Sequence, residues 1–116
     1  MMIEDDAAYL VQMIEHADKA VRKLGSRTLD ELSGDEDLRY VLLHLVQIVG
    51  EAARRVSVEC QEAHPKIPWR AVIGMRHKIV HDYMEINDRI LWEVVAFELQ
   101  PLIDALRESL PPQASG

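Results

Sequence analysis

Apolar residues recur at steps of three and four along most of this chain, and that spacing is the feature that most restricts its fold. The clearest run covers residues 7–24, a second covers 38–56, and a third covers 91–106. Side chains at these spacings lie on one face of an α-helix. The sequence therefore predicts a protein built from packed amphipathic helices.

Capping residues and glycine set the first boundaries between these helices. Gly25 is expected to end the first helix, and residues 26–34 form the connection that follows it. Either Ser33 or Asp35 can cap the second helix, whose acidic first turn suits the helix dipole. The apolar pattern predicts that this second helix continues to about Ala63.

Two prolines mark the next boundary, because residues 64–68 read His-Pro-Lys-Ile-Pro and proline forces its predecessor out of helical geometry. Pro68 is expected at the first position of a third helix that fades near Tyr83. Asn87 or Asp88 is expected to cap the fourth helix.

Four helices joined by short links predict an all-α fold, an up-and-down antiparallel bundle of four to five helices. Pro101 falls inside the fourth helix and should kink it or loosen one turn. Residues 1–110 are expected to form one domain, and residues 111–116 are expected to form a flexible tail.

Composition restricts the function as well. No apolar run approaches the roughly 20 residues that span a bilayer, so no membrane contact is expected. The single cysteine, Cys60, excludes an intrachain disulfide and favours a cytoplasmic location. The net charge of −7 argues against broad nucleic-acid binding. Residues 51–83, however, carry a local balance of +2.

That basic region contains the chain's densest group of reactive side chains, in the pattern Arg76, four residues, His81, one residue, Tyr83. A guanidinium binds phosphate oxygens in bidentate fashion and keeps its charge. An imidazole exchanges protons near neutral pH. Together they suit RNA cleavage without a metal, in which a base activates the 2′-hydroxyl and a cation stabilises the charge that builds on phosphorus.

A regular helix through this motif would place Arg76 and His81 about 140° apart, which is too splayed for direct contact. Three solutions stay open: the helix loosens before His81, the long arginine reaches round, or a second subunit completes the site. Ordinary roles also stay open, since Arg76 could pair with Glu51 or Asp82.

A metal site is the weaker interpretation of the two histidines. His77 and His81 have the i, i+4 spacing that lets two imidazoles share one ion. A third ligand is missing, however, and Lys78 takes the place of the glutamate in the HExxH pattern. Neither a metal nor a cofactor is predicted.

Residues 66–83 read Lys-Ile-Pro-Trp-Arg-Ala-Val-Ile-Gly-Met-Arg-His-Lys-Ile-Val-His-Asp-Tyr. This stretch resembles the signature of the HepT-like toxins, members of the HEPN superfamily of small helical ribonucleases. Residues 48–55, Ile-Val-Gly-Glu-Ala-Ala-Arg-Arg, are similar to that family's second helix. The resemblance extends from the first helix to Leu106.

The resemblance implies a HEPN-like homodimer that cleaves RNA without a metal. It implies the toxin half of a type II toxin–antitoxin system, neutralised by an MNT-type nucleotidyltransferase antitoxin. The motif arginine and histidine of both subunits are expected to line a shared cleft at the dimer interface. The alternative is a catalytically inactive helical dimer that binds a nucleotidyltransferase or a nucleotide.

The resemblance also assigns roles to individual residues. Arg76 and His81 are expected to be catalytic, and Tyr83 is expected to receive AMP from the antitoxin. His77 stands where the family commonly has a polar residue, often asparagine, so it is expected to assist catalysis. Arg70 and Lys78 are expected to bind RNA phosphates.

Overall fold

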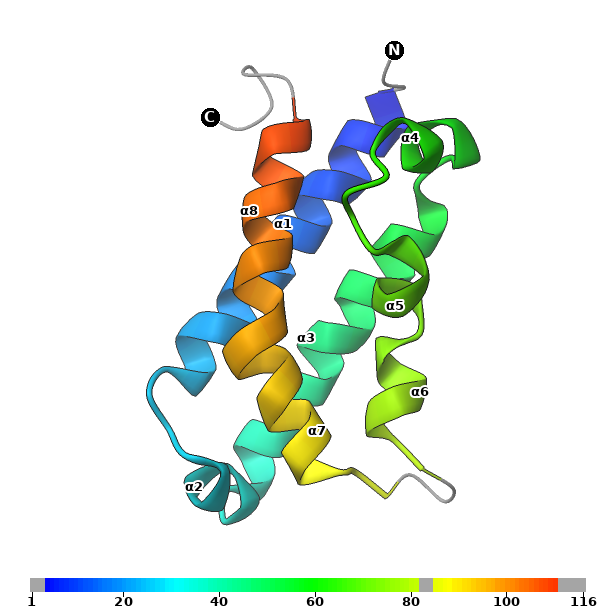
Figure 1. The fold of residues 1–116 in the computed structure, drawn as a ribbon. Coiled ribbons are helices and arrows are strands. Elements are labelled where there is room, and N and C mark those ends of the chain that lie inside the picture. Colours follow the sequence, from blue (N-terminus) through cyan, green and yellow to red (C-terminus); the bar gives the residue numbers. More distant parts are fainter. Residues whose placement is uncertain (1–3, 82–84, 111–116) are drawn as a thin grey trace.

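The computed structural model describes residues 4–81 and 85–110. Every regular element in these residues is helical (Figure 1). In chain order they are α1 (Glu4–Leu24), α2 (Leu29–Ser33), α3 (Glu36–Arg55), α4 (Val58–Ala63), α5 (Trp69–Ile73), α6 (Met75–Ile79), α7 (Asp88–Glu93), the π-helix η2 (Val94–Glu98) and α8 (Leu99–Ser109).

The chain crosses the length of the bundle in four passes of alternating direction (Figure 1). α1 descends, α3 ascends beside it, and α5 and α6 descend along α3. The continuous rod of α7, η2 and α8 then ascends, with α7 against α6 and with η2 and α8 against α1. The predicted all-α, up-and-down bundle is confirmed. None of the helices in the described residues has the length and apolar character needed to cross a membrane.

The core follows from the apolar pattern, because each long helix turns its apolar stripe inward. α1 packs against both α3 and α8. Leu10 and Met13 of α1, Val49 of α3, and Ile103 and Leu106 of α8 are fully buried members of the same hydrophobic core. This burial is the main source of the bundle's stability.

The predicted helix ends at Gly25 and Asn87 are confirmed. Gly25 has a φ of +57°, in the left-handed region that favours glycine, and its N–H bonds to the Val21 carbonyl at 2.9 Å. Of the two caps considered for α3, Asp35 is the one used, since its carboxylate accepts the Leu38 N–H at 3.0 Å. Asn87 caps α7 in the same way.

The prediction that the second helix reaches Ala63 is wrong. α3 ends at Arg55, and the chain turns before α4 begins. The cause is a tertiary contact: buried Asp6 of α1 accepts both the backbone N–H and the hydroxyl of Ser57, each at 2.7 Å. The Ser57 hydroxyl then caps α4 by accepting the Cys60 N–H at 3.1 Å.

The expected loosened turn at Pro101 is confirmed and lies just ahead of it. η2 is a π-helical turn, in which the Leu99 N–H bonds to the Val94 carbonyl five residues back. Proline has no N–H and its ring crowds the carbonyl four residues earlier, so a wider preceding turn relieves that contact.

Candidate active site

The single third helix that the sequence predicts is instead two short helices, and only Arg76 of the motif lies within them. α5 and α6 are separated at Gly74, and α6 ends at Ile79, four residues before Tyr83. Pro68 occupies the N-cap of α5, one position ahead of the first helical residue where it was expected. Glycine weakens a helix interior by about 1 kcal/mol, and the β-branched Val80 favours the extended backbone that follows.

Beyond α6, residues 79–81 pair in antiparallel fashion with residues 85–87. Val80 is extended, with φ −108° and ψ 122°, and forms an isolated β-bridge with Ile86. The His81 N–H donates to the Glu85 carbonyl at 2.8 Å, and the Asn87 N–H donates to the Ile79 carbonyl at 2.7 Å. The backbone that carries His81 is therefore held by hydrogen bonds between residues 79–81 and residues 85–87 of the same chain.

Asp82 and Tyr83 lie outside the described residues. The modification role expected for Tyr83 and the possible pairing of Arg76 with Asp82 therefore stay predictions. The other partner considered for Arg76 is engaged elsewhere, because the Glu51 carboxylate accepts a 2.6 Å hydrogen bond from Arg54.

The end of α6 decides how His81 is presented. Successive side chains of an extended strand point to opposite sides. Val80 is buried and His81 is exposed, so the imidazole points away from the core. Of the three solutions left open by the sequence, the structure has the helix ending before His81.

The same break removes the geometric basis of the metal interpretation. His77 lies on α6 and His81 lies beyond its end, so the two imidazoles are not one helical turn apart on one face. Within residues 4–81 and 85–110, no three histidine, cysteine or acidic side chains are grouped closely enough to hold a metal ion.

The three polar residues of α6 fan out across its outer side. Met75 and Ile79 are buried and fix the inner face of the helix. Arg76, His77 and Lys78 lie between them in sequence and differ by about 100° each around the axis. Arg76 is half-buried with its Nε atom shielded from solvent, whereas His77 and Lys78 are exposed.

Arg76 and His81 are close along the chain's path. The Arg76 carbonyl accepts the Val80 N–H at 2.8 Å, which closes the last turn of α6 immediately before His81. The site thus joins a cation on the final turn of a helix to an exposed imidazole on the turn that follows. A permanent cation and an imidazole are a pair of groups that suits phosphate-ester cleavage.

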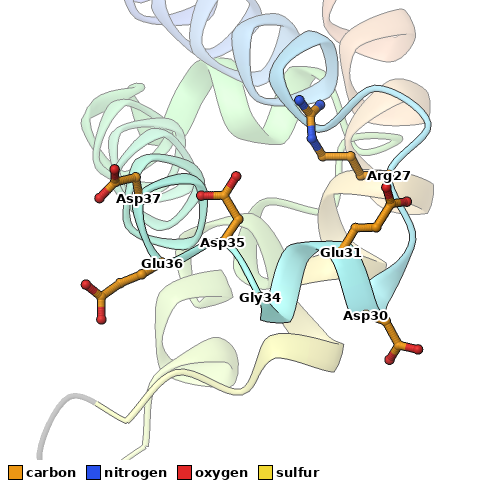
Figure 2. A pocket seen from close by; sticks show the side chains of 7 residues that line it. All are labelled: Arg27, Asp30, Glu31, Gly34, Asp35, Glu36 and Asp37. Carbon is orange, nitrogen blue, oxygen red and sulfur yellow. The ribbon is translucent and has the colours of Figure 1, made fainter.

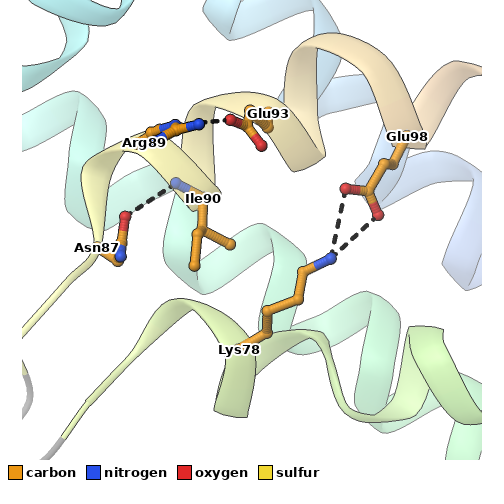
Figure 3. Close-up of polar contacts among 6 residues, drawn as sticks. All are labelled: Lys78, Asn87, Arg89, Ile90, Glu93 and Glu98. Carbon is orange, nitrogen blue, oxygen red and sulfur yellow. Dashed lines mark hydrogen bonds and ion pairs between the residues drawn. The ribbon is translucent and has the colours of Figure 1, made fainter.

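The two expected phosphate-binding residues differ in their surroundings. The Lys78 ammonium lies 3.4 Å from both carboxylate oxygens of Glu98, a contact that links α6 to η2 (Figure 3). Arg70 is exposed on α5, one short helix ahead of Arg76. The structure therefore has Lys78 in an ion pair that the sequence did not reveal.

Close packing against α3 fixes the position of the motif helices. Gly50 is buried where α3 meets α5, and a Cβ atom there would lie 3.2 Å from the Val72 carbonyl oxygen. The Trp69 indole N–H donates to the His64 carbonyl at 3.1 Å and anchors the start of α5. A half-buried ion pair of 2.7 Å between Arg39 and Asp88 ties α3 to α7 at the other end of the turn.

A hollow of about 640 Å³ lies where α2 meets the start of α3 (Figure 2). Its lining is mostly acidic, and the Thr28 backbone N–H and hydroxyl bond to Glu31 and lower the pKa of that carboxyl. The negative charge of these carboxylates repels the phosphates of an RNA strand. The charge of the hollow therefore does not suit RNA binding. Its lining residues are Arg27, Asp30, Glu31, Gly34, Asp35, Glu36 and Asp37.

A comparison with known families decides the class of this protein. The family model described as "Ribonuclease HepT-like" matches residues 13–109. The chain belongs to the HepT-like ribonuclease family. This membership confirms the family and the ribonuclease class that residues 66–83 indicated.

Several relatives share most of the chain. "Putative RNase TTE0752" of Caldanaerobacter subterraneus subsp. tengcongensis is 28% identical over 102 residues, which cover 88% of this chain and 91% of the relative. "Putative RNase MJ1380" of Methanocaldococcus jannaschii is 27% identical over 95 residues, covering 82% and 87%. "Probable ribonuclease HepT" of Thermococcus cleftensis is 26% identical over 98 residues, covering 84% of each chain. No solved structure matches the chain.

Proposed function

We propose that this HepT-like ribonuclease is a metal-independent endoribonuclease whose site is built on Arg76 and His81. The observation that carries the proposal is the end of α6 at Ile79, which turns His81 outward directly after the helical turn that begins at Arg76. The two groups thereby lie on adjoining segments. Because His81 is not part of the helix, the roughly 140° separation of a regular helix does not apply to them.

Each step of the cleavage can be written for these two side chains. The neutral His81 imidazole takes the proton of a ribose 2′-hydroxyl, and the freed oxygen attacks the adjacent phosphorus. The Arg76 guanidinium binds the non-bridging oxygens as negative charge builds on them. The bond from phosphorus to the 5′-oxygen breaks, that oxygen takes a proton from the His77 ring or from water, and a 2′,3′-cyclic phosphate remains.

His77 supports this reaction from the exposed side of α6. It lies between Arg76 and Lys78 on the outer surface of the helix, where its ring can bond to a phosphate oxygen or supply a proton to the leaving 5′-oxygen. Arg70 and Lys78 bind phosphates on either side of the cleaved bond.

The active unit is a homodimer in which a twofold axis brings two copies of the motif together. A single chain presents His81 on an exposed turn, and a second copy would enclose it and exclude water. Large apolar side chains are available for such a contact: Tyr40 is 56% exposed and Phe97 is 63% exposed.

In the cell the protein acts as a toxin in the cytoplasm, neutralised by an MNT-type nucleotidyltransferase antitoxin. Tyr83 follows His81 by two residues, so AMP added to its phenol would bring bulk and negative charge to the place that an RNA phosphate must occupy. Growth arrest on expression, with rescue by the nucleotidyltransferase but not when Tyr83→Phe toxin is used, tests this regulation.

RNA cleavage by the purified protein in EDTA tests the catalytic assignment. Arg76→Ala and His81→Ala should each lower the rate by about 10²- to 10⁴-fold. His44→Ala is the matched control, because His44 is an exposed histidine on the long helix α3, outside the motif. Wild-type rates in both motif variants would contradict the assignment. A wild-type protein that cuts no RNA but binds a nucleotidyltransferase would support the inactive-module alternative.

A further inference from the structure

Lys78, which the proposed RNA site uses as a phosphate-binding cation, is paired with Glu98 in the free protein. The Lys78 ammonium is equally far, 3.4 Å, from the two carboxylate oxygens of Glu98 (Figure 3). A phosphodiester also presents two equivalent anionic oxygens to a cation. The Glu98 carboxylate therefore occupies the position that a phosphate would take in front of Lys78.

Lys78 serves a different phosphate from the one that is cleaved. Two residues along a helix differ by about 200° around its axis, so Arg76 and Lys78 lie on opposite flanks of the buried face of α6. His77, exposed, lies between them on the outer side. An RNA strand that crosses α6 from Arg76 toward η2 would bring a flanking phosphate to Lys78.

Glu98 differs from its neighbour Glu93 in the element to which it pairs. Glu93 of α7 pairs within its own helix, with Arg89 at 3.0 Å. Glu98, on η2, pairs across to α6, which carries the motif. Both Lys78 and Glu98 are 49% exposed, so solvent and a competing anion can reach the contact from outside.

We propose that Glu98 is an intramolecular competitor for the RNA phosphate that Lys78 binds. In the free protein its carboxylate holds the ammonium, and RNA must displace it to gain the flanking contact. This inference rests on the proposed function. Exposed ion pairs of this kind are weak, so the competition lowers RNA affinity by about two- to fivefold. RNA strands that also contact Arg76 bind tightly enough to displace Glu98 from Lys78. Other polyanions, which lack the Arg76 contact, bind more weakly.

Binding of a fluorescein-labelled, single-stranded 2′-O-methyl RNA of mixed sequence tests the proposal. The probe lacks the free 2′-hydroxyl needed for cleavage, so fluorescence anisotropy gives the dissociation constant of the intact protein. Glu98→Gln should tighten binding about two- to fivefold at low salt. Glu93→Gln removes the same charge from the neighbouring helix without touching Lys78, and it should change binding less.

A double-mutant cycle identifies the residue through which Glu98 acts. Lys78→Gln should weaken binding, and adding Glu98→Gln to it should have no further effect. The proposal is overturned if Glu98→Gln binds RNA no tighter than Glu93→Gln, or if its gain persists in the Lys78→Gln protein.

Cleavage of unmodified RNA in EDTA separates this inference from the proposed function. If wild-type protein cuts RNA through Arg76 and His81 while Glu98→Gln leaves binding unchanged, only the competitor role fails. If no cleavage depends on Arg76 or His81, the proposed function fails instead. Equal thermal unfolding temperatures of wild type and Glu98→Gln would show that a change in binding does not come from unfolding.

Discussion

The long helices α1 and α3 contrast with the segment from Val56 to Asn87. α1 has 21 residues and α3 has 20, each without interruption, whereas the described residues between α3 and α7 form helices of only 6, 5 and 5 residues and one isolated β-bridge. The long pair supplies much of the core. The broken segment carries every residue proposed to act on RNA.

The difference shows how the two regions satisfy their backbones. In α1 and α3 the hydrogen bonds repeat within the helix, so every side chain takes the position that the 3.6-residue period dictates. In the broken segment, hydrogen bonds to other parts of the chain replace helical ones, as when the Asn87 N–H bonds to the Ile79 carbonyl. That freedom places His81 where a regular helix would not.

The sharpest test of the contrast is the contact that ends α3. Asp6→Ala removes a buried carboxylate and leaves the Ser57 N–H and hydroxyl without their acceptor. We expect the free energy of unfolding to fall by about 2 to 3 kcal/mol, measured in urea. Glu15→Ala, an exposed acidic residue on the same helix, should change it by no more than about 0.5 kcal/mol. Equal effects of the two substitutions would mean that Asp6 does not hold the break in place.

Two matched helix caps separate stability from activity. Asp35 caps α3 and Asn87 caps α7, each accepting one backbone N–H at 3.0 Å. Either alanine substitution should lower the free energy of unfolding by about 1 kcal/mol. Only Asn87→Ala should also lower kcat/KM for RNA, by about tenfold. Loss of the side-chain cap loosens the start of α7, and the backbone N–H at this position is the one that bonds to the Ile79 carbonyl just before His81.

That comparison requires kcat/KM to be measured where both variants are fully folded. Equal losses of activity in Asp35→Ala and Asn87→Ala would contradict the view that only the broken segment determines the geometry of the site.

The smallest expected effect concerns Cys60, at the junction of the two regions. Burial, and next the nearby Asp6 carboxylate, raise the pKa of this thiol. The folded chain therefore keeps a proton that the unfolded chain has lost above its ordinary thiol pKa of about 8.5. The stability that Cys60 contributes is fully present below that pH and is lost as the pH rises through the folded pKa.

Urea unfolding at a series of pH values checks this sign. The free energy of unfolding of wild type should fall more steeply above pH 8.5 than that of Cys60→Ala, which has no thiol to ionise. Parallel curves would show that the thiol ionises equally easily in the folded and unfolded chain. Slow alkylation of the folded protein, and fast alkylation in urea, would agree with a buried thiol.

The sequence by itself determined the parts that depend on local physics. Apolar spacing predicted the all-α bundle, and glycine's backbone freedom marked the end of the first helix at Gly25. Capping side chains narrowed two helix starts to Ser33 or Asp35 and to Asn87 or Asp88. The Arg76 and His81 pattern, with residues around it, identified the family. Each of these signals lies within a few residues of the feature that it predicts, so periodicity and capping rules detect it.

The tertiary structure alone decided where the pattern breaks. Nothing near Ser57 in the chain indicates that Asp6, 51 residues away, will end α3 there. Nothing near Lys78 indicates that Glu98 will lie against it. These contacts join residues whose separation in sequence carries no period, and their energies depend on burial and distance that exist only once the bundle has formed.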